Sequence, residues 1–284
     1  VCGPGRKAVE LFEAVHRGQI RALWVLGTNP AVSLPDGNRV REALSRCELL
    51  VVSEVTANTD TARLAHLLLP AAAWGEKSGT VTNSERTISR QRAFLPLPGE
   101  ARPDWWALTQ LARRLGFGEG SAYEHEHEIF CEHAALSGFE NQGRRQFDIS
   151  GLAGLSRAEF EALEPLSWPV NADWPQGRAR LFEDGRFATP DGRARLLPLA
   201  QHFPPQHDAA PRGEDLPLLL NSGRLRDQWH TMTRTGHVPR LQEAEPWPRV
   251  RVGAASLLAL GAREGDLVRL HNELGEALLL VGLD

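Results

Sequence analysis

Residues 22–30 read Ala-Leu-Trp-Val-Leu-Gly-Thr-Asn-Pro, an apolar run that ends abruptly in a polar turn. Five apolar residues in a row predict a strand that is buried on both faces, and Gly-Thr-Asn-Pro is typical of a turn. Similar apolar runs follow at 49–53 and at 67–69. Strands that alternate with helices indicate a parallel, Rossmann-like α/β sheet. The predicted helices cover 8–15, a segment that opens at Pro35-Asp36 and runs to Leu44, and 59–65.

The pattern changes after this first sheet. Residues 74–99 are polar and extended in character, and a helix is predicted over 105–115, with Trp105, Leu108, Leu111, Ala112 and Leu115 facing inward. Pro103-Asp104 suits the first turn of that helix, where a carboxylate complements the helix dipole. Residues 117–200 lack a clear period and are expected to form an irregular elaboration of the α/β domain.

A Pro-rich segment, 204–217, divides the chain into a predicted α/β domain, 1–203, and a mainly β domain, 218–284. Turn residues 272–275 (Asn-Glu-Leu-Gly) predict a β-hairpin. The other elements expected in the second domain are strands at 218–221, 247–252, 266–271 and 276–281 and a helix at 254–260.

Composition narrows the function classes. The 284 residues are 42% hydrophobic and 24% charged, with a formal net charge of −4, which is typical of a globular protein and gives no basic footprint for nucleic acid. No apolar run is long enough to cross a membrane. Cys2, Cys47 and Cys131 are isolated, which excludes a thiolate cluster within this chain and predicts a reducing, cytoplasmic location. Because the chain starts at Val1 and holds a single methionine, we expect it to be part of a longer protein.

Polar side chains follow the first two predicted strands. In a parallel sheet, ligands bind at the carboxyl ends of the strands, where Asn29 and the pair Ser53-Glu54 are expected to lie. An amide and a carboxylate there are suited to hold a ribose or the N–H edge of a guanine. The alternative is that Asn29 belongs to ordinary turn chemistry and that Glu54 is a solvated cap. Neither GxGxxG nor GxxxxGK[ST] occurs, so a plain NAD or ATP site is unsupported.

Two further segments are rich in hydrogen-bond donors. Lys77 is one of only two lysines among 32 basic residues, and it is either a phosphate or carbonyl ligand or an ordinary surface lysine. Residues 222–231 (Ser-Gly-Arg-Leu-Arg-Asp-Gln-Trp-His-Thr) follow a predicted strand, and Arg224 suits a diphosphate. His125, His127 and His133 with Glu124 and Glu126 match no zinc or di-iron spacing, so a charged helix face is the preferred interpretation.

Six segments carry a resemblance to the bacterial molybdopterin oxidoreductases, and within that family to the catalytic subunits of assimilatory nitrate reductases. The resemblance extends over nearly the whole chain. The segments are 22–30, Leu69-Pro-Ala-Ala-Ala-Trp-Gly-Glu-Lys77 with Thr82-Asn-Ser-Glu-Arg86, Gly99-Glu-Ala-Arg-Pro-Asp104, Leu136-Ser-Gly-Phe-Glu140, and Arg224-Leu-Arg-Asp-Gln-Trp-His-Thr-Met-Thr-Arg234.

The resemblance implies four domains around a molybdenum atom held by two molybdopterin guanine dinucleotides, with a [4Fe-4S] cluster nearby. This chain is similar to the third domain and the start of the fourth, a double-psi β-barrel. Many relatives have Asp where Glu54 stands and Thr where Ser222 stands. The resemblance implies no catalytic or metal-ligating residue in this chain, because the cysteines for molybdenum and cluster lie outside it. The implied cofactor contacts are Asn29, Ser53, Glu54, Lys77, Asp104, Ser222, Gly223, Arg224, Gln228, Trp229, His230 and Thr231.

The implied activity is the reduction of nitrate to nitrite by two-electron oxygen-atom transfer, with electrons from a donor protein or flavoprotein domain. This portion is expected to bind the guanine dinucleotide arms and to be inactive alone. Two alternatives stay open: a formate dehydrogenase-like member of the same family, and a free-standing guanine-nucleotide-binding module without redox activity.

Overall fold

A computed structural model describes residues 4–198 and 218–284 of the chain. Its contacts divide the chain into two units. Unit 1 combines residues 1–68 with 205–284, and unit 2 is residues 69–204. The predicted hinge at 204–217 and the predicted domain boundary at 203 lie outside the described residues and stay predictions.

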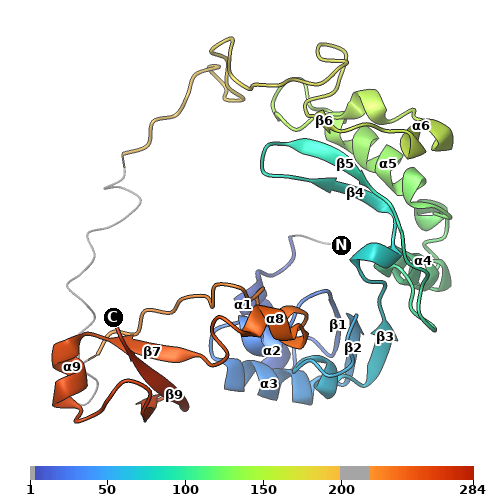
Figure 1. The fold of residues 1–284 in the computed structure, drawn as a ribbon. Coiled ribbons are helices and arrows are strands. Elements are labelled where there is room, and N and C mark those ends of the chain that lie inside the picture. The colour runs from blue at the N-terminus through green and yellow to red at the C-terminus, as the bar shows by residue number, and fades with distance from the viewer. Residues whose placement is uncertain (1–3, 199–217) are drawn as a thin grey trace. The chain divides into compact units, whose positions relative to one another are not determined.

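The first sheet contains β1 (Ala22–Leu26), β2 (Leu49–Glu54) and β3 (Leu67–Pro70) in that order. Strands β1 and β2 are parallel, with Val25 opposite Val52 (Figure 1). The strands predicted from the three apolar runs are confirmed. Because β1 and β2 run in the same direction, the loops that follow them leave the sheet at one edge.

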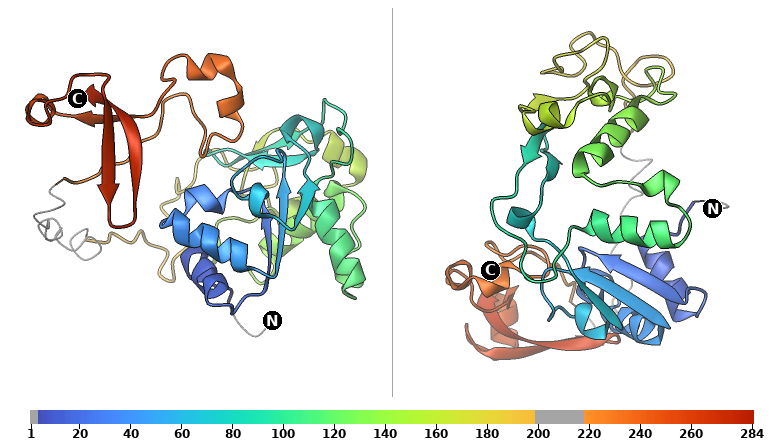
Figure 2. Two further views of the ribbon diagram at one scale, coloured as in Figure 1. Left: turned by 90° about the horizontal axis from the view of Figure 1, so that it is seen from below. Right: turned by 90° about the vertical axis from the view of Figure 1, so that its right-hand side faces the viewer.

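Helices α1 (Ala8–His16) and α3 (Gly37–Arg46) lie on one face of this sheet (Figure 2). Asp36 caps α3, since its carboxylate accepts a hydrogen bond from the Arg39 N–H at 3.4 Å. A short helix, α2 (Pro30–Ser33), follows β1. The buried side chains between helices and sheet form the core of unit 1: Val15, Val25, Ala31, Val40, Ala43, Leu44, Cys47, Leu50, Val52 and Ala62.

The helix predicted over 59–65 is reduced to one 3₁₀ turn, Ala62–Leu64. Its start is set by Thr59, whose Oγ1 accepts a hydrogen bond from the Ala62 N–H at 3.1 Å. Its end is set by His66, whose N–H donates to the Leu50 carbonyl at 2.9 Å and returns the chain to the sheet. Pairing with β2 therefore leaves no room for a longer helix.

Glu13 joins α1 to α3. Its carboxylate accepts hydrogen bonds from Arg39 Nε and Nη2 and from Arg17 Nε, each 2.8 Å long. The hydrogen bond from Arg39 is the largest influence that lowers the pKa of Glu13 from its usual value of 4.5 to about 2. Because the pKa is lower in the folded state, the carboxylate stabilises the fold above about pH 4.5, and this contribution is lost as the pH falls towards 2.

We therefore expect Glu13→Gln to lower the thermal unfolding midpoint at pH 7 and to have a smaller effect at pH 3. Circular dichroism of the full-length protein measures both midpoints. Glu10→Gln is the matched control, since Glu10 is exposed in the first turn of the same helix. Equal decreases at the two pH values would contradict the role of the Glu13 charge.

Unit 2 has an antiparallel sheet of β4 (Gly79–Thr82), β5 (Thr87–Gln91) and β6 (Leu166–Ser167). Its helices are α4 (Asp104–Arg114), α5 (Glu126–Gly138) and α6 (Arg157–Glu161). The 13-residue α5 corrects the expectation that residues 117–200 are wholly irregular. The buried side chains that hold the unit together are Ile88, Phe130, Ala134, Ile149, Leu152, Phe160 and Val170.

The predicted inward face of α4 is wrong at three positions. Leu108, Leu111 and Leu115 are 46%, 42% and 62% exposed. The buried residue of this helix is instead Thr109. A period in the sequence shows which side chains share a helix face, but not whether another element covers that face.

The C-terminal part of unit 1 forms a three-stranded sheet in the order β7-β9-β8, from β7 (Arg249–Val252), β8 (Leu267–Asn272) and β9 (Gly275–Leu283). The predicted hairpin and the helix α9 (Ala254–Ala259) are confirmed. Residues 218–221 do not form the predicted strand, since no described strand pairs with them. The double-psi barrel stays a prediction. Among the described residues, no helix has both the length and the apolarity that a membrane crossing requires.

Candidate functional site

The edge of the first sheet at which β1 and β2 end carries the first candidate residues. Gly27 follows β1 with a φ of +61°, a conformation that glycine adopts without strain. Its N–H donates to the Ser53 carbonyl at 3.3 Å. The loop after β1 is thereby tied to the end of β2, as the rule for parallel sheets predicts.

Asn29 is 5% exposed and its side-chain amide is engaged on both sides. Its Oδ1 accepts hydrogen bonds from Thr61, at 3.1 Å from the backbone N and 2.7 Å from Oγ1. Its Nδ2 donates to Thr231 Oγ1 at 3.2 Å. Asn29 therefore connects the sheet edge with the segment 222–231, although 202 positions separate the two partners in the chain.

Ser53 and Glu54 are both buried at the end of β2. Ser53 Oγ accepts a hydrogen bond from Trp24 Nε1 at 2.9 Å. Glu54 Oε1 accepts one from the Val55 N–H at 2.8 Å and lies 3.5 Å from Arg234 Nη2. Glu54 is therefore not the solvated cap of the alternative interpretation, because its side chain is only 5% exposed.

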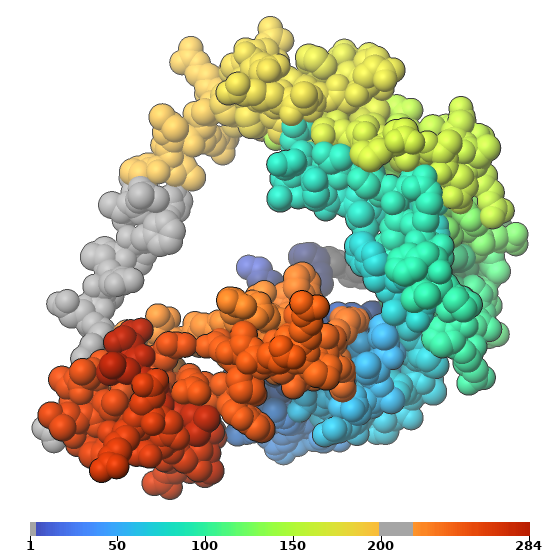
Figure 3. Space-filling view, viewed as in Figure 1, coloured from blue at the N-terminus to red at the C-terminus, as the bar shows by residue number. Residues whose placement is uncertain are grey.

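The segment 228–235 borders the first sheet, and its orange atoms lie against blue and cyan ones in the space-filling view (Figure 3). Gln228 is buried and braces the segment, since its Nε2 donates to the Leu241 carbonyl at 3.1 Å and its Oε1 accepts from Thr235 Oγ1 at 2.7 Å. Trp229 and His230 are exposed, with their rings 4.5 Å apart and edge to face. Thr231 is half-buried.

Ser222, Gly223 and Arg224 are exposed and line a groove of about 1520 Å³ in unit 1. Residues 36–41 at the start of α3 and strands of the C-terminal sheet form its other walls. Arg41, Arg224 and Arg249 have no carboxylate partner among the described residues. The groove therefore offers guanidinium groups without a carboxylate partner among the described residues, which suit a phosphate or other anion.

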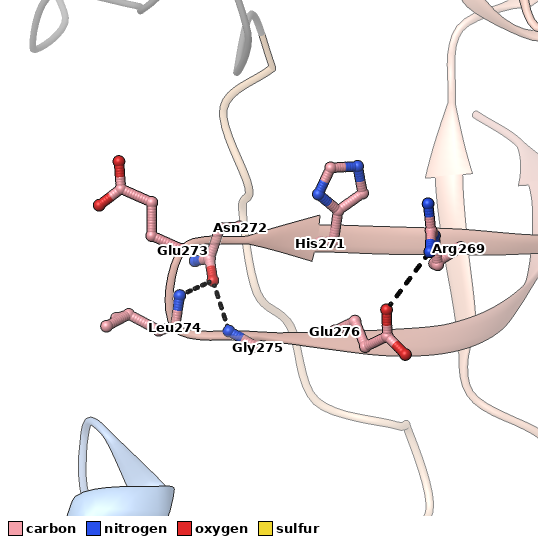
Figure 4. A pocket seen from close by; sticks show the side chains of 7 residues that line it. All are labelled: Arg269, His271, Asn272, Glu273, Leu274, Gly275 and Glu276. Atoms are coloured by element: carbon pink, nitrogen blue, oxygen red, sulfur yellow. Dashed lines mark hydrogen bonds and ion pairs between the residues drawn. The ribbon is translucent and has the colours of Figure 1, made fainter.

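A smaller hollow of about 330 Å³ lies on the hairpin between β8 and β9 (Figure 4). Asn272 Oδ1 accepts hydrogen bonds from the N–H groups of Leu274 and Gly275, at 2.8 and 3.1 Å. Arg269 and Glu276 form an exposed ion pair of 3.6 Å. These contacts explain the turn, and none of the predicted site residues takes part in them.

Lys77 and Asp104 belong to unit 2, and both are half-buried. Lys77 follows a short 3₁₀ helix (Trp74–Glu76), and Asp104 is the first residue of α4, as predicted. Neither side chain forms an ion pair among the described residues. The remaining predicted site residues lie in unit 1.

Arg90 supports the segment that carries Lys77. Its guanidinium is fully buried, lies 3.9 Å from the Phe160 ring centroid, and donates to Ser78 Oγ at 3.0 Å and to the Gly79 carbonyl. It also donates to Glu161 at 2.8 Å, and this hydrogen bond is the largest influence that lowers the pKa of Glu161. The two residues that follow Lys77 are therefore held by one buried cation.

His125, Glu126 and Glu161 lie together, with one ligand atom from each within 4.8 Å of the others. His125 Nδ1 accepts a hydrogen bond from the His127 N–H at 3.1 Å, so a neutral ring carries its proton on Nε2. That nitrogen lies 3.7 Å from Glu126 and 4.0 Å from Glu161. A protonated Nε2 cannot bind a metal, so this geometry disfavours a metal ion and leaves a ring N–H that faces the two carboxylates.

Sequence reasoning missed two residues at the sheet edge. Thr61 is 0% exposed and contacts Asn29 twice, and its Oγ1 also accepts a hydrogen bond from the Ala31 N–H at 3.2 Å. Arg234 pairs with Glu54. Thr61 lies in a Thr-Asp-Thr stretch whose pattern predicts only the start of a helix. In the sequence, Arg234 is marked only as the last residue of the segment 224–234 that carries the family resemblance.

Two protein-family models match this chain, and together they cover the segments of Asn29 and Thr231. The model of the molybdopterin oxidoreductase family matches residues 1–114, and that of the molybdopterin dinucleotide binding domain matches residues 218–283. A nitrate reductase from Klebsiella oxytoca is 53% identical over 96% of this chain and 30% of its own length. A nitrate reductase from Shewanella frigidimarina is 46% identical over 94% of this chain and 28% of its own length.

Among solved structures, acetylene hydratase from Pelobacter acetylenicus has a similar fold. The TM-score is 0.65 at 19% identity, over 97% of this chain and 37% of that chain. The chain therefore spans about a third of the length of the proteins that it matches. From the two matching family models and the nitrate reductase relatives, we conclude that the chain belongs to the molybdopterin oxidoreductase family.

Proposed function

We propose that this chain binds the guanine dinucleotide arms of a molybdenum bis(molybdopterin guanine dinucleotide) cofactor, within a larger enzyme that reduces nitrate to nitrite. The hydrogen bond between Asn29 Nδ2 and Thr231 Oγ1 carries this proposal. It joins the two segments that the family resemblance assigns to the cofactor, one from each of the regions that the family models match. Nitrate reductase relatives support nitrate as the substrate.

The available polar groups fit the parts of such a cofactor. Glu54 Oε2 has no hydrogen-bond partner among the described residues, and a carboxylate oxygen suits the N–H edge of a guanine. Ser222 and Arg224 are exposed donors, which suit a diphosphate. Trp229 and His230 offer exposed rings against which a heterocycle can pack.

The molybdenum centre supplies the two-electron oxygen-atom transfer when the cofactor is bound. The chain's own residues bind and orient the dinucleotide arms, with Lys77 and Asp104 as donor and acceptor from unit 2. None of them is assigned to bond-making, so the chain alone is expected to be inactive. The ligands of a [4Fe-4S] cluster and of molybdenum are proposed to lie outside this chain. A donor protein or flavoprotein domain is the proposed source of electrons.

A cytoplasmic location is part of the same proposal. Cys47 and Cys131 are free thiols, which suits a reducing compartment. A formate dehydrogenase-like activity and a binding module without redox activity are the competing functions. Assays of nitrate reduction and formate oxidation on the full-length protein, together with its molybdenum content, distinguish the three.

The experiment on the site measures molybdenum and guanine nucleotide per molecule of full-length protein. We expect Lys77→Ala, Asp104→Ala and Arg224→Ala each to lower both, because each leaves polar cofactor atoms unpaired at a cost of about 1–3 kcal/mol. That cost corresponds to roughly 5- to 100-fold weaker binding. Lys7→Ala is the matched control, since Lys7 is the other lysine and is exposed. Full loading of all three variants would overturn the proposal.

A further inference from the structure

The hydrogen bonds around Asn29 have a fixed direction. The backbone N–H of Thr61 can only donate, so the amide atom of Asn29 that faces it, 3.1 Å away, must be the oxygen. The Ala31 N–H also can only donate, and it donates to Thr61 Oγ1. The Thr61 hydroxyl therefore gives its own proton to Asn29 Oδ1, at 2.7 Å.

This direction continues to Thr231. Because Asn29 Oδ1 faces Thr61, its NH₂ group faces Thr231 and donates to Oγ1 at 3.2 Å. The Thr231 hydroxyl is then an acceptor towards the sheet, and its own proton points elsewhere. Among the described residues, no group accepts that proton. Thr231 is half-buried, so its hydroxyl is open to a ligand or to water.

We propose that Thr61 and Asn29 are positioning residues that leave the Thr231 hydroxyl as a hydrogen-bond donor, directed to an acceptor oxygen or nitrogen of the bound cofactor. This inference rests on the proposed function and adds the polarity of one contact. It gives the buried Asn29 amide a role other than direct contact with the cofactor, which agrees with the low exposure of Asn29. Thr61 fixes the orientation, because a flipped amide would set two donors against each other.

The decisive variant is Asn29→Asp, which keeps the shape of the side chain and replaces its donor with a carboxylate oxygen. Thr231 then gives its proton to that oxygen and loses it for the cofactor. Ser33→Asp is the matched control, since it adds the same charge to an exposed position in the next helix. Thr231→Val removes the hydroxyl, and Thr231→Ser retains it.

Guanine-nucleotide content of the full-length enzyme is the first readout. We expect Asn29→Asp and Thr231→Val each to lower it at least fivefold, and the double variant to lose no more than either one. Thr231→Ser, Thr61→Ser and Ser33→Asp should keep a nucleotide content within twofold of the unmodified enzyme. The nucleotide content of Thr61→Val should lie between that of these variants and that of Asn29→Asp. Circular dichroism at the same temperature checks that each variant is folded.

The pH profile of Asn29→Asp separates polarity from a merely structural defect. A protonated carboxyl group again donates to Thr231, so lowering the pH should restore nucleotide content relative to the unmodified enzyme at the same pH. Additive losses in the double variant, or no recovery at low pH, would overturn the inference. If Thr231→Val loads fully while Lys77→Ala and Arg224→Ala do not, this inference fails and the proposed function stands. If all of them load fully, both fail.

Discussion

Replacement of Arg90 by alanine is expected to destabilise the β4–β5 region of unit 2 by about 3 kcal/mol, because a fully buried side chain that donates to several polar groups is removed. The guanidinium is fully buried, stacks on Phe160, and donates to Ser78, the Gly79 carbonyl and Glu161. Its loss leaves a cavity beside Phe160 and removes the donor to Ser78 Oγ and to the Gly79 carbonyl. Because Ser78 and Gly79 follow Lys77, the variant should also lose cofactor.

Hydrogen exchange followed by mass spectrometry on the full-length enzyme measures this effect. Amides of 79–91 should exchange roughly a hundredfold faster in Arg90→Ala, which is the ratio that corresponds to about 3 kcal/mol. Arg92→Ala is the matched control, because Arg92 is exposed and makes a single hydrogen bond, to the Glu161 carbonyl at 2.9 Å. Equal exchange in the two variants would show that burial of Arg90 contributes nothing.

Leu44→Ala should destabilise the first sheet by about 3 kcal/mol, within the usual range for a buried leucine. Leu44 lies on α3, is 0% exposed, and packs in the core of unit 1 beside residues of both β1 and β2. These strands carry the loops of Asn29 and Glu54. The cavity is therefore expected to loosen the sheet edge as well as the core.

The measurement is again hydrogen exchange, here of the amides in 22–26 and 49–54. Leu44→Met serves as control, because it nearly conserves volume and should cost less than about 1.5 kcal/mol. Guanine-nucleotide content should fall in Leu44→Ala and stay unchanged in Leu44→Met. If the two variants exchange alike, then the fit of Leu44 in the core does not determine the stability of the sheet.

The first sheet was predictable because its apolar runs are continuous and their turns are unambiguous. Elements that depend on a neighbour were not. Residues 218–221 have the apolar pattern of a strand, but no described strand pairs with them. Residues 59–65 have helical character, yet His66 pairs with Leu50 and ends the turn early. Local pattern decides what a segment can form, and tertiary contacts decide what it does form.

The positions of the candidate site residues in the fold were predictable to a similar extent. The rule for parallel sheets correctly brings Asn29 and Glu54 to one edge, and the polar segment 222–231 follows from composition alone. The hydrogen bond from Asn29 to Thr231 was not predictable, because no period or spacing relates positions so far apart. Thr61 was missed for another reason. The sequence shows that residue 61 is a threonine, but not whether its hydroxyl is buried or exposed.

The assembly of unit 1 from both ends of the chain has a consequence for biosynthesis. A ribosome that has made Asn29 must add 202 further residues before Thr231 exists. At 5–20 residues per second this delay is roughly 10–40 s. During most of that interval the core residues between 15 and 62 have been synthesised, whereas Thr231 has not. The proposed function therefore places cofactor loading after translation of residues 228–235, because a chain that stops before Thr231 lacks one partner of the Asn29 hydrogen bond.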